Sequence, residues 1–467
     1  MADKPDIGNL KPYPAYKDSG VPWLGQVPAH WAVVRLGALL RERMEFNDDL
    51  RITEVLSVTK HRGVIPYKEK GNIGNKKSDD ITRYKIVRPN DIVVNCMNVI
   101  IGSVGLSRQT GCLSPVYYVL MQRTENDNIL YLNACFQTKP FQESLIRIGN
   151  GILAHRMRIP MELLKCEPFP RPAAEEQTGI VRFLDYVDRR IRRVIRARQR
   201  RVKLLEEYKQ ALIHQAVTGQ IDVRTGKPYP AYKDSGVEWL GQVPAHWEVR
   251  RLKCICRLIY GDALPEASRK DGGVPVYGSN GRVGFHDVSN THSPCIILGR
   301  KGSFGKIQYS DVPVFAIDTT YFVDSINTTV NLRWLFFVLN CVRLDEVSKD
   351  SAVPGLDRED AYRCLLPLPP NPEQNAIVEY LNVLTAKIDT VIAASQREIE
   401  LLREYRERII ADVVTGKVDV REVAAKLPEE PPEEIELMEE DELAESKEEN
   451  REEGDGFTEE ISEEDDR

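Results

Sequence analysis

Two histidines at equivalent places in the chain are the first candidates for chemistry. His30 and His246 belong to a set of only seven histidines in 467 residues, and an imidazole can transfer protons near neutral pH or bind a metal. A catalytic histidine needs a nucleophile or further ligands within reach, and the flanking sequence "VPAHW" offers none. We therefore predict that both histidines are structural or face a partner, and that the chain is not an enzyme.

Glycine-rich stretches are the second candidates, since backbone amides in such loops can bind phosphate. The stretch "GQIDVRTGK" at Gly219 lacks the glycine spacing of a phosphate loop, and Pro228 stands where a Ser or Thr would hold magnesium. The glycines of "GRKGSFG", residues 299–305, do not form GxGxxG. The first stretch is typical of a helix stop and the second of a turn between strands.

Cysteine usage argues against a structural metal site. Nine cysteines are scattered along the chain and only Cys254 and Cys256 are close together, so no zinc-ligand spacing recurs and reduced thiols are expected. The N-terminus shows no apolar segment after a positive one, and no run approaches 18 apolar residues. The sequence predicts a soluble, cytoplasmic protein that binds no metal.

The charge is divided between a basic body and an acidic end. Residues 427–467 hold 21 acidic and three basic residues, a net charge of −18, while the whole chain carries −7. The remainder is therefore +11, which is typical of proteins that bind polyanions. We expect residues 425–467 to form a disordered acidic tail that aids solubility. Mimicry of DNA by this tail is the alternative.

An internal repeat organises the chain. The peptide "KPYPAYKDSGVPWLGQVPAHW" at residues 11–31 recurs at residues 227–247, with only Pro22 replaced by Glu238. Further on, "EEQTGIVRFLDYVDRRI" at Glu175 resembles "PEQNAIVEYLNVLTAKI" at Pro372, and "VTGQIDVR" resembles "VTGKVDVR". The peptide repeats at an offset of 216 residues and the later parts at 197, so the stretch between them is 19 residues longer in the first half. The repeat has constant ends and a variable middle.

Each constant part contains a heptad pattern of apolar residues with a polar break. About 40 residues of helix at ~1.5 Å per residue form a rod of roughly 60 Å. We predict that the two helices pair as an antiparallel coiled coil with pseudo-two-fold symmetry; packing of each helix on its own neighbouring domain is the alternative. The predicted seam consists of Ile180, Leu184, Val187, Ile191, Val194, Leu205, Tyr208 and Leu212, and of Ile377, Leu381, Leu384, Ile388, Val391, Leu402, Tyr405 and Ile409.

The two variable middles have the pattern of globular α/β domains. Strand-like runs occur at 91–99, 115–122, 294–300 and 314–324, and an apolar helical segment starts from Asn128 or Asn331. The predicted fold class is mixed α/β, with two α/β domains separated by the two long helices. The predicted segments are 1–31 with the first peptide, 32–170 as the first variable domain, 171–226 as the central helical region, 227–247 as the second peptide, 248–368 as the second variable domain, 369–424 as the C-terminal helical region and 425–467 as the tail.

The order of these parts resembles the specificity subunit of type I restriction–modification systems. The likeness rests on "YKDSGVxWLGQVPAHWxVxRL", a divergent domain, and a long helix that opens with "EQ" and closes with "VTGxxDVR", all present twice. It covers about residues 11–422, and order, spacing and duplication all agree.

The resemblance implies that each middle is a target recognition domain for one half of a bipartite, asymmetric DNA sequence, while the paired helices fix the distance between halves. It implies two methyltransferase subunits and restriction or translocase subunits as partners. These partners would bind S-adenosylmethionine, ATP and magnesium, and this chain would be a non-catalytic scaffold without a cofactor. A nuclease with a divergent active site and a coiled-coil adaptor without sequence-selective DNA binding are the alternatives.

Side-chain chemistry selects DNA-binding candidates within the polar, glycine-rich segments of the middles. Arg and Lys suit guanine edges and phosphates, Asn and Gln suit adenine, and Ser, Thr and Tyr serve either. The candidates are Thr59, Lys60, Arg62 and Asn98 in the first middle, and Ser279, Asn280, Arg282, Arg300, Lys301, Ser303, Thr319, Thr320 and Tyr321 in the second. Ten basic residues between positions 182 and 203 could also contact phosphates or an acidic partner, or only solvent.

The repeated peptide is a candidate docking surface, because two identical partners need two equivalent surfaces. Recent duplication and recombination between the repeats are the alternative reasons for its identity. The docking candidates are Trp23, His30, Trp31, Trp239, His246 and Trp247.

Overall fold

The computed structural model describes residues 10–60, 62–70, 77–78, 80–151, 157–345 and 355–428. They form two compact units: unit 1 comprises residues 1–198 and 398–467, and unit 2 comprises residues 199–397. The predicted acidic tail lies outside the described residues from residue 429 on. Two helices of 44 residues each, α5 (Ala174–Val217) and α8 (Asn371–Val414), continue from one unit into the other.

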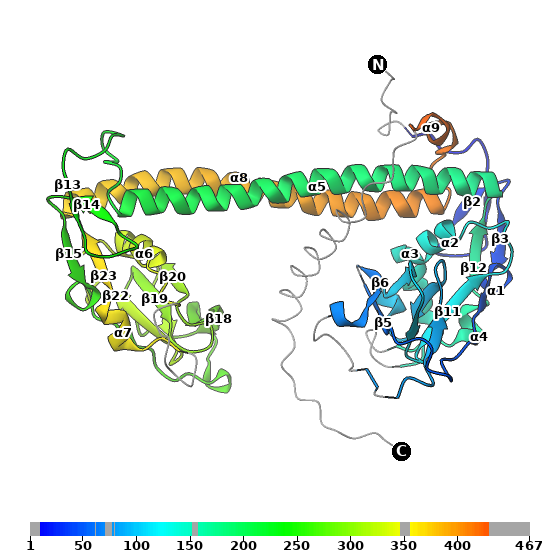
Figure 1. The fold of residues 1–467 in the computed structure, drawn as a ribbon, viewed down its shortest axis with the longest axis horizontal. Helices are drawn as coiled ribbons and strands as arrows, with labels where there is room; N and C mark the ends of the chain where they lie inside the picture. The colour runs from blue at the N-terminus through cyan, green and yellow to red at the C-terminus, as the bar shows by residue number, and fades with distance from the viewer. Residues whose placement is uncertain are drawn as a thin grey trace. The chain divides into compact units, whose positions relative to one another are not determined.

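Unit 1 is built around a four-stranded antiparallel sheet in the order β4–β11–β8–β9; β11 is labelled in Figure 1. These strands are Leu40–Glu42, Tyr117–Gln122, Ile92–Asn95 and Val104–Leu106. Four two-stranded sheets surround it, namely β1 (Tyr16–Asp18) with β2 (Gln26–Pro28), β3 (Ala32–Arg35) with β12 (Pro168–Arg171), β5 (Leu56–Thr59) with β6 (Gly63–Pro66), and β7 (Lys85–Val87) with β10 (Gly111–Leu113). The shorter helices are α1 (Leu36–Leu39), α2 (Ile129–Phe136), α3 (Lys139–Ser144), α4 (Met161–Leu164) and α9 (Arg421–Lys426).

Unit 2 has the same kind of central sheet, in the order β16–β22–β19–β20. These strands are Ile259–Tyr260, Thr320–Asp324, Cys295–Gly299 and Ile307–Ser310. The other sheets are β13 (Tyr232–Asp234) with β14 (Gln242–Pro244), β15 (Glu248–Arg251) with β23 (Leu365–Leu368), and β18 (Gly281–His286), β17 (Val274–Gly278) and β21 (Phe315–Ala316) in that order. Its shorter helices are α6 (Leu332–Cys341) and α7 (Arg358–Arg363).

The two central sheets correspond strand for strand although the sequences of the two middles do not match. β4, β11, β8 and β9 of unit 1 occupy the same places in their sheet as β16, β22, β19 and β20 of unit 2. Neighbouring strands are antiparallel within each sheet. The predicted helical segments are confirmed as α2 and α6, and each begins after an asparagine cap. Asn128 Oδ1 accepts from Leu130 N at 3.0 Å, and Asn331 Oδ1 accepts from Arg333 N at 2.9 Å, which satisfies amides that lack helical partners. The predicted mixed α/β fold is confirmed.

Within each unit, α5 and α8 lie side by side and run in opposite directions (Figure 1). In unit 1, Ile180 and Ile191 share a core with Ile409, and Arg198 Nη2 lies 2.8 Å from Glu398 Oε1. In unit 2, Ile213 shares a core with Ile377 and Leu381, and Lys209 Nζ lies 2.6 Å from Asp389 Oδ1. The predicted antiparallel pairing is therefore confirmed in both units, and the helices also pack on the domains beside them.

The strict heptad count is wrong at three positions of the seam. Val194, Tyr208 and Tyr405 are 41%, 56% and 43% exposed, while Ile195 and Ile392 are buried. A straight α-helix has 3.6 residues per turn, so positions counted at 3.5 drift by about 20° per heptad, and the seam advances by one residue after Ile191. The remaining predicted positions are buried or half-buried, namely Ile180, Leu184, Val187, Ile191, Leu205, Leu212, Ile377, Leu381, Leu384, Ile388, Val391, Leu402 and Ile409.

Each long helix ends before a glycine in the left-handed conformation. Gly219 follows α5 with a φ of 74° and Gly416 follows α8 with a φ of 77°, as helix-stop signals predict. No helix in the described parts of the chain is both long and apolar enough to cross a membrane.

Candidate nucleic-acid interface

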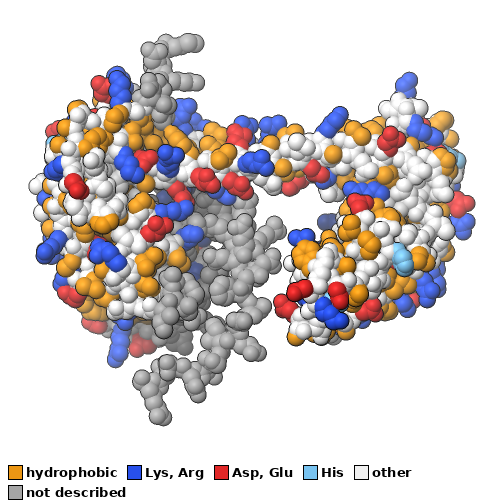
Figure 2. Space-filling model, turned by 180° about the vertical axis from the view of Figure 1, so that it is seen from behind, with side chains coloured by type: hydrophobic (Ala, Val, Ile, Leu, Met, Phe, Trp, Pro, Cys, Tyr) orange, Lys and Arg blue, Asp and Glu red, His pale blue; other side chains and the backbone are white. Residues whose placement is uncertain are grey.

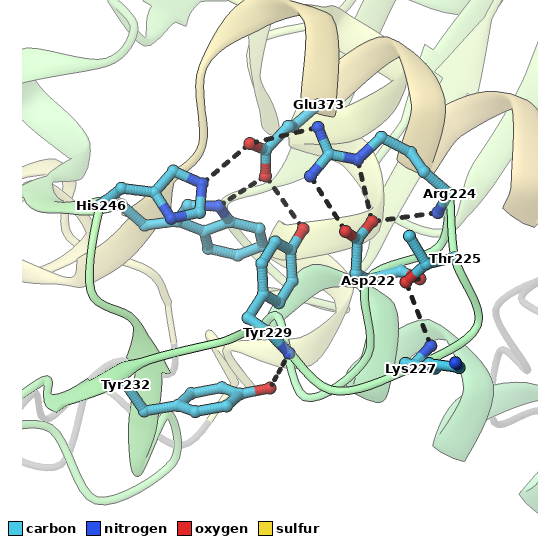
Figure 3. Close-up of polar contacts among 9 residues, drawn as sticks. Asp222, Arg224, Thr225, Lys227, Tyr229, Tyr232, His246 and Glu373 are labelled. Carbon is cyan, nitrogen blue, oxygen red and sulfur yellow. Dashed lines mark hydrogen bonds and ion pairs between the residues drawn. The ribbon is translucent and has the colours of Figure 1, made fainter.

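A buried carboxylate in the first turn of α8 binds the repeated peptide in unit 2 (Figure 3). Glu373 accepts hydrogen bonds from Tyr229 Oη at 2.9 Å and Trp247 Nε1 at 2.8 Å, and its second oxygen lies 2.8 Å from His246 Nε2. Arg224 pairs with Asp222, and its Nη1 lies 3.6 Å from Glu373 Oε1. The peptide and the "VTGxxDVR" turn are therefore fastened together at the start of α8.

The same cluster recurs in unit 1 around Glu176 in the first turn of α5. Tyr13 Oη donates at 2.7 Å, Trp31 Nε1 donates at 3.0 Å, and His30 Nε2 lies 2.9 Å from the other oxygen. The "VTGxxDVR" turn is here supplied by the far end of the chain, since Asp419 N donates to Lys11 O at 2.8 Å. In unit 2 the equivalent hydrogen bond joins two residues that are close in sequence, since Asp222 N donates to Lys227 O, also at 2.8 Å.

These clusters correct the docking prediction for two residues. Trp31 and Trp247 are both fully buried, so they hold the peptide in place and cannot contact a partner. Trp23 and Trp239 are half-buried; Trp23 packs on Phe141 and Trp239 on His214. The side chains of His30 and His246 are 45% and 46% exposed, so each imidazole is partly accessible to solvent.

The Glu373 cluster is expected to lose stability in acid. Burial alone would raise the pKa of Glu373, but hydrogen bonds from Trp247, His246 and Tyr229 outweigh burial and lower the pKa. A carboxylate with a lowered pKa in the folded state stabilises the fold above its unfolded pKa, and this stability is lost as the pH falls.

We expect Glu373→Gln to lower the free energy of unfolding by about 2 kcal/mol at pH 7. The difference from the unchanged protein should shrink as the pH falls below about 4.5, the ordinary value for this group. Urea unfolding followed by tryptophan fluorescence between pH 3.5 and 7 measures both effects. Glu379→Gln, at an exposed position of the same helix, is the control. A pH-independent loss would show that the ionised carboxylate is not what stabilises the cluster.

The structure brings the DNA-binding candidates of unit 2 together from three separate segments. The tip of the β17–β18 hairpin carries Ser279 and Asn280, and the β19–β20 turn carries Ser303, whose Oγ lies 3.4 Å from Asn280 Oδ1. The third segment is the residue before β22, Thr319. Its carbonyl oxygen accepts hydrogen bonds from Arg300 N at 2.8 Å and Lys301 N at 3.2 Å, which links it to the residues that follow β19. One polar site therefore forms where a hairpin meets a turn.

Arginine and lysine in this site are held to different degrees. The Arg300 guanidinium lies 4.9 Å from the ring centre of Tyr260 and 5.8 Å from that of Tyr321, which fixes its plane. Lys301 is exposed, as is Arg282, which lies over Phe285. Phe285 and Arg282 are exposed on β18, an edge strand of the three-stranded sheet, and are types of side chain that enter DNA grooves.

Two predicted DNA contacts in unit 2 are wrong because their side chains are buried. Thr320 is fully buried and its Oγ1 donates to Ile317 O at 2.7 Å. Tyr321 is 1% exposed, and its hydroxyl donates to Leu356 O at 3.2 Å. Burial raises the pKa of Tyr321 to about 12, so it is a neutral support for Arg300.

In unit 1 the candidates lie at the equivalent place, where the β5–β6 hairpin meets the β8–β9 turn. The backbones of Gly63 and Gly105 approach so closely that a side-chain carbon on Gly105 would lie 2.7 Å from Gly63 Cα. Lys60 is exposed, and the aliphatic part of its side chain lies beside Gly102, which follows Asn98 by four residues. Thr59 Oγ1 accepts from Arg62 N at 3.2 Å. Arg62 itself is paired with Glu69 at 2.7 Å, so it braces the hairpin.

Comparison with known proteins agrees with this repeated arrangement. A family model described as the type I restriction modification DNA specificity domain matches residues 244–401. The MjaVIII specificity subunit of a type I restriction enzyme from Methanocaldococcus jannaschii is 22% identical over 432 residues, which cover 85% of this chain and 95% of that protein. Residues 244–401 therefore match a type I DNA specificity domain, and most of the chain is similar to a type I restriction–modification specificity subunit.

The fold of this protein is also found in a solved structure. That structure concerns complex assembly and conformational transition of the type I R-M system. Its chain superposes with a TM-score of 0.64 at 16% identity, and the match covers 84% of this protein and 99% of that chain. The family match to residues 244–401 falls mostly on unit 2, and the matching sheet order extends the likeness of fold to unit 1.

The protein exposes a repeated apolar pair on its long helices. Leu204 and Tyr208 of α5, in unit 2, are 58% and 56% exposed. Leu401 and Tyr405 of α8, in unit 1, occupy the equivalent repeat positions and are 58% and 43% exposed. Residues four apart share one face of a helix, and the recurrence of the exposed Leu–Tyr pair at equivalent positions of both helices makes it a candidate contact surface. Figure 2 shows hydrophobic side chains among charged ones along the helices.

Much of the basic cluster at positions 182–203 is engaged within the protein. Arg189 pairs with Asp185, Arg192 lies 2.8 Å from Asp188, and Arg182 donates to Leu427 O at 2.6 Å. These bonds hold several of the ten basic side chains against neighbouring groups, but two aspartates leave the cluster strongly positive. Arg200, Arg201 and Lys203 remain exposed.

Sequence reasoning missed the residues that hold the site in place. Glu176 and Glu373 bind the peptide, while the next residues, Gln177 and Gln374, accept from Asn128 N at 2.7 Å and Asn331 N at 2.9 Å and so tie α2 and α6 to the long helices. The sequence did contain a signal for these four residues, because the same Glu-Gln pair occurs at the start of both long helices although most other polar residues of the repeat differ. Lys306, which contacts Asn280, had no such signal.

Proposed function

We propose that this protein is a specificity subunit that reads a split, asymmetric DNA sequence, one half at the site in each unit. The observation that carries the proposal is that equivalent elements, a hairpin tip and the turn after the same central strand, carry different polar side chains in the two units. Lys60 and Asn98 occupy the site in unit 1, and Asn280, Arg300 and Lys301 occupy it in unit 2. Equivalent scaffolds with different contact groups suit two different base sequences.

The proposed partners are two methyltransferase subunits together with restriction or translocase subunits. S-adenosylmethionine, ATP and magnesium are proposed to bind to those partners. Within the described residues, no group of three His, Cys, Asp or Glu side chains is placed to hold a metal ion, and neither glycine-rich stretch opens a helix onto a phosphate site. The role of the helices in setting the distance between half-sites stays a prediction, as does the scaffold's lack of catalytic activity.

The exposed part of the repeated peptide supports a docking role. Lys17, Gln26 and Ala29 are exposed and identical to Lys233, Gln242 and Ala245. By contrast, exposed helix positions have diverged, for example Lys203 against Glu400 and Ala211 against Arg408. A recent duplication would have left the helices equally alike, so selection by a partner and recombination between the peptides are the remaining explanations.

Methylation mapping tests the proposal. Long-read sequencing of DNA from the host and from a strain without this subunit should show a split, asymmetric motif that loses its modification only in the second strain. A purely structural adaptor would leave both methylomes identical.

Changes at the two sites should act on separate halves of the motif. We expect Lys60→Ala to lower discrimination in one half of the motif and Lys301→Ala in the other, each by about tenfold. The measurement is the fraction of near-motif sites that become methylated in each variant strain. An effect of either change on both halves would contradict the assignment of one half to each unit.

A further inference from the structure

Asn280, at the tip of the β17–β18 hairpin, is held in one orientation by its neighbours. The ammonium group of Lys306 contacts Asn280 Oδ1, and Ser303 Oγ lies 3.4 Å from the same oxygen. A lysine ammonium can only donate, so the oxygen of the amide, not its nitrogen, must face Lys306. The two hydrogens on Asn280 Nδ2 have no partner among the residues that the structure describes.

The surroundings of this amide also favour an acceptor as the ligand. Asn280 and Lys306 line a pocket of about 460 Å³ together with Gln308, Asn340 and Arg343. The pocket holds two basic side chains and one acidic one, Asp345. Lys306 has three hydrogens and gives one to Asn280, so at least one more can be directed outward.

The chemistry of base edges decides which base this arrangement fits. Adenine shows an acceptor and a donor in the major groove, and asparagine reads it with its nitrogen and its oxygen together. Here the oxygen is occupied by Lys306 and Ser303, so that pairing is blocked. Guanine shows two acceptors, N7 and O6, which match one hydrogen from Asn280 and one from Lys306.

We propose that Asn280 and Lys306 act as a pair of donors that reads a guanine in the half-site of unit 2. The proposal rests on the proposed function and adds the identity of one base. It also reverses the expectation from residue type, because an isolated asparagine would suit adenine. Lys306 is a positioning residue for the Asn280 amide as well as a donor to the base.

The test uses the assembled complex and duplexes that contain the motif found by methylation mapping. Four duplexes that differ only at one base pair of the unit 2 half-site are compared by competition binding, for each base pair in turn. We expect one guanine whose replacement weakens binding about tenfold or more. Replacing its N7 by carbon, or removing O6 by using 2-aminopurine, should weaken binding at the same position.

Two variants separate the roles of the pair. Asn280→Asp keeps a partner for Lys306 but presents no N–H donor, so the preference for guanine at this position should fall about tenfold. Lys306→Met frees the Asn280 oxygen, and adenine should then be bound within about threefold of guanine. Lys253→Met, which removes an exposed charge elsewhere in unit 2, is the control and should leave the preference unchanged. The first half of the motif should be read as before in every variant.

Several results would overturn the inference. Equal weakening on all duplexes would make the pair a phosphate contact, and a unit 2 half-site without a G·C pair would exclude the proposed ligand. Unchanged preferences in both variants would show that other residues read this half. In these cases the split motif itself would still support the proposed function. A complex without any split motif would overturn both.

Discussion

Replacing Gly219 by alanine is expected to lower the free energy of unfolding by about 3 kcal/mol. Gly219 ends α5 with a φ of 74°, a conformation that costs a residue with a side chain roughly 1–2 kcal/mol. An added side-chain carbon would also lie 2.4 Å from Pro244 Cδ and 3.0 Å from Trp247 Cη2. Such overpacking costs roughly 1–3 kcal/mol more, because Trp247 is fixed by Glu373 and cannot yield.

A matched glycine separates the two causes of this loss. Gly236 has a φ of 69°, but a side-chain carbon there would meet nothing within 4 Å, so Gly236→Ala should cost only the backbone part, about 1 kcal/mol. Gly416→Ala is the equivalent change in unit 1, where Pro28 and Trp31 take the places of Pro244 and Trp247. Denaturant unfolding of the three variants measures the differences. Equal losses at Gly219 and Gly236 would show that packing against the peptide contributes nothing.

Charging the exposed leucines of the long helices is expected to remove the two proposed methyltransferase subunits from the complex one at a time. Leu204→Asp and Leu401→Asp each place a carboxylate in the centre of one exposed Leu-Tyr pair. Burying an unpaired charge in a contact is strongly unfavourable, whereas a surface change of this kind alters folding stability by about 0.5 kcal/mol or less. Each single variant should therefore bind one methyltransferase subunit, and the double variant none.

Native mass spectrometry of the reconstituted complex measures this stoichiometry. Val383→Asp provides the matched control: Val383 is 52% exposed on α8, but its repeat equivalent on α5, Tyr186, is buried, so this position is not a repeated surface. The Val383→Asp variant should still bind two subunits. Retention of two subunits by the double variant would place the docking surface elsewhere, and the exposed face of the repeated peptide would be the next candidate.

The sequence alone determined the parts of this protein that depend on local periodicity and on internal identity. A helix-stop glycine and the apolar heptads predicted the two long helices α5 and α8, because these signals act within one or two helical turns. The repeat predicted two equivalent units, and its family resemblance predicted the specificity-subunit function. The pairing of the helices followed because an amphipathic seam must be covered.

Only the tertiary structure decided which of the repeated residues are buried and which polar groups meet. The drift of a 3.6-residue helix against a 3.5-residue count moved Tyr208 and Tyr405 from the seam to the surface. Trp31, Trp247 and Tyr321 have side chains that suit either a contact surface or a core, and only the position of Glu176, Glu373 or Arg300 fixes the choice. The Asn280–Lys306 contact joins residues from two separate strand pairs. Its donor character depends on which atom faces which, and residue type does not specify that.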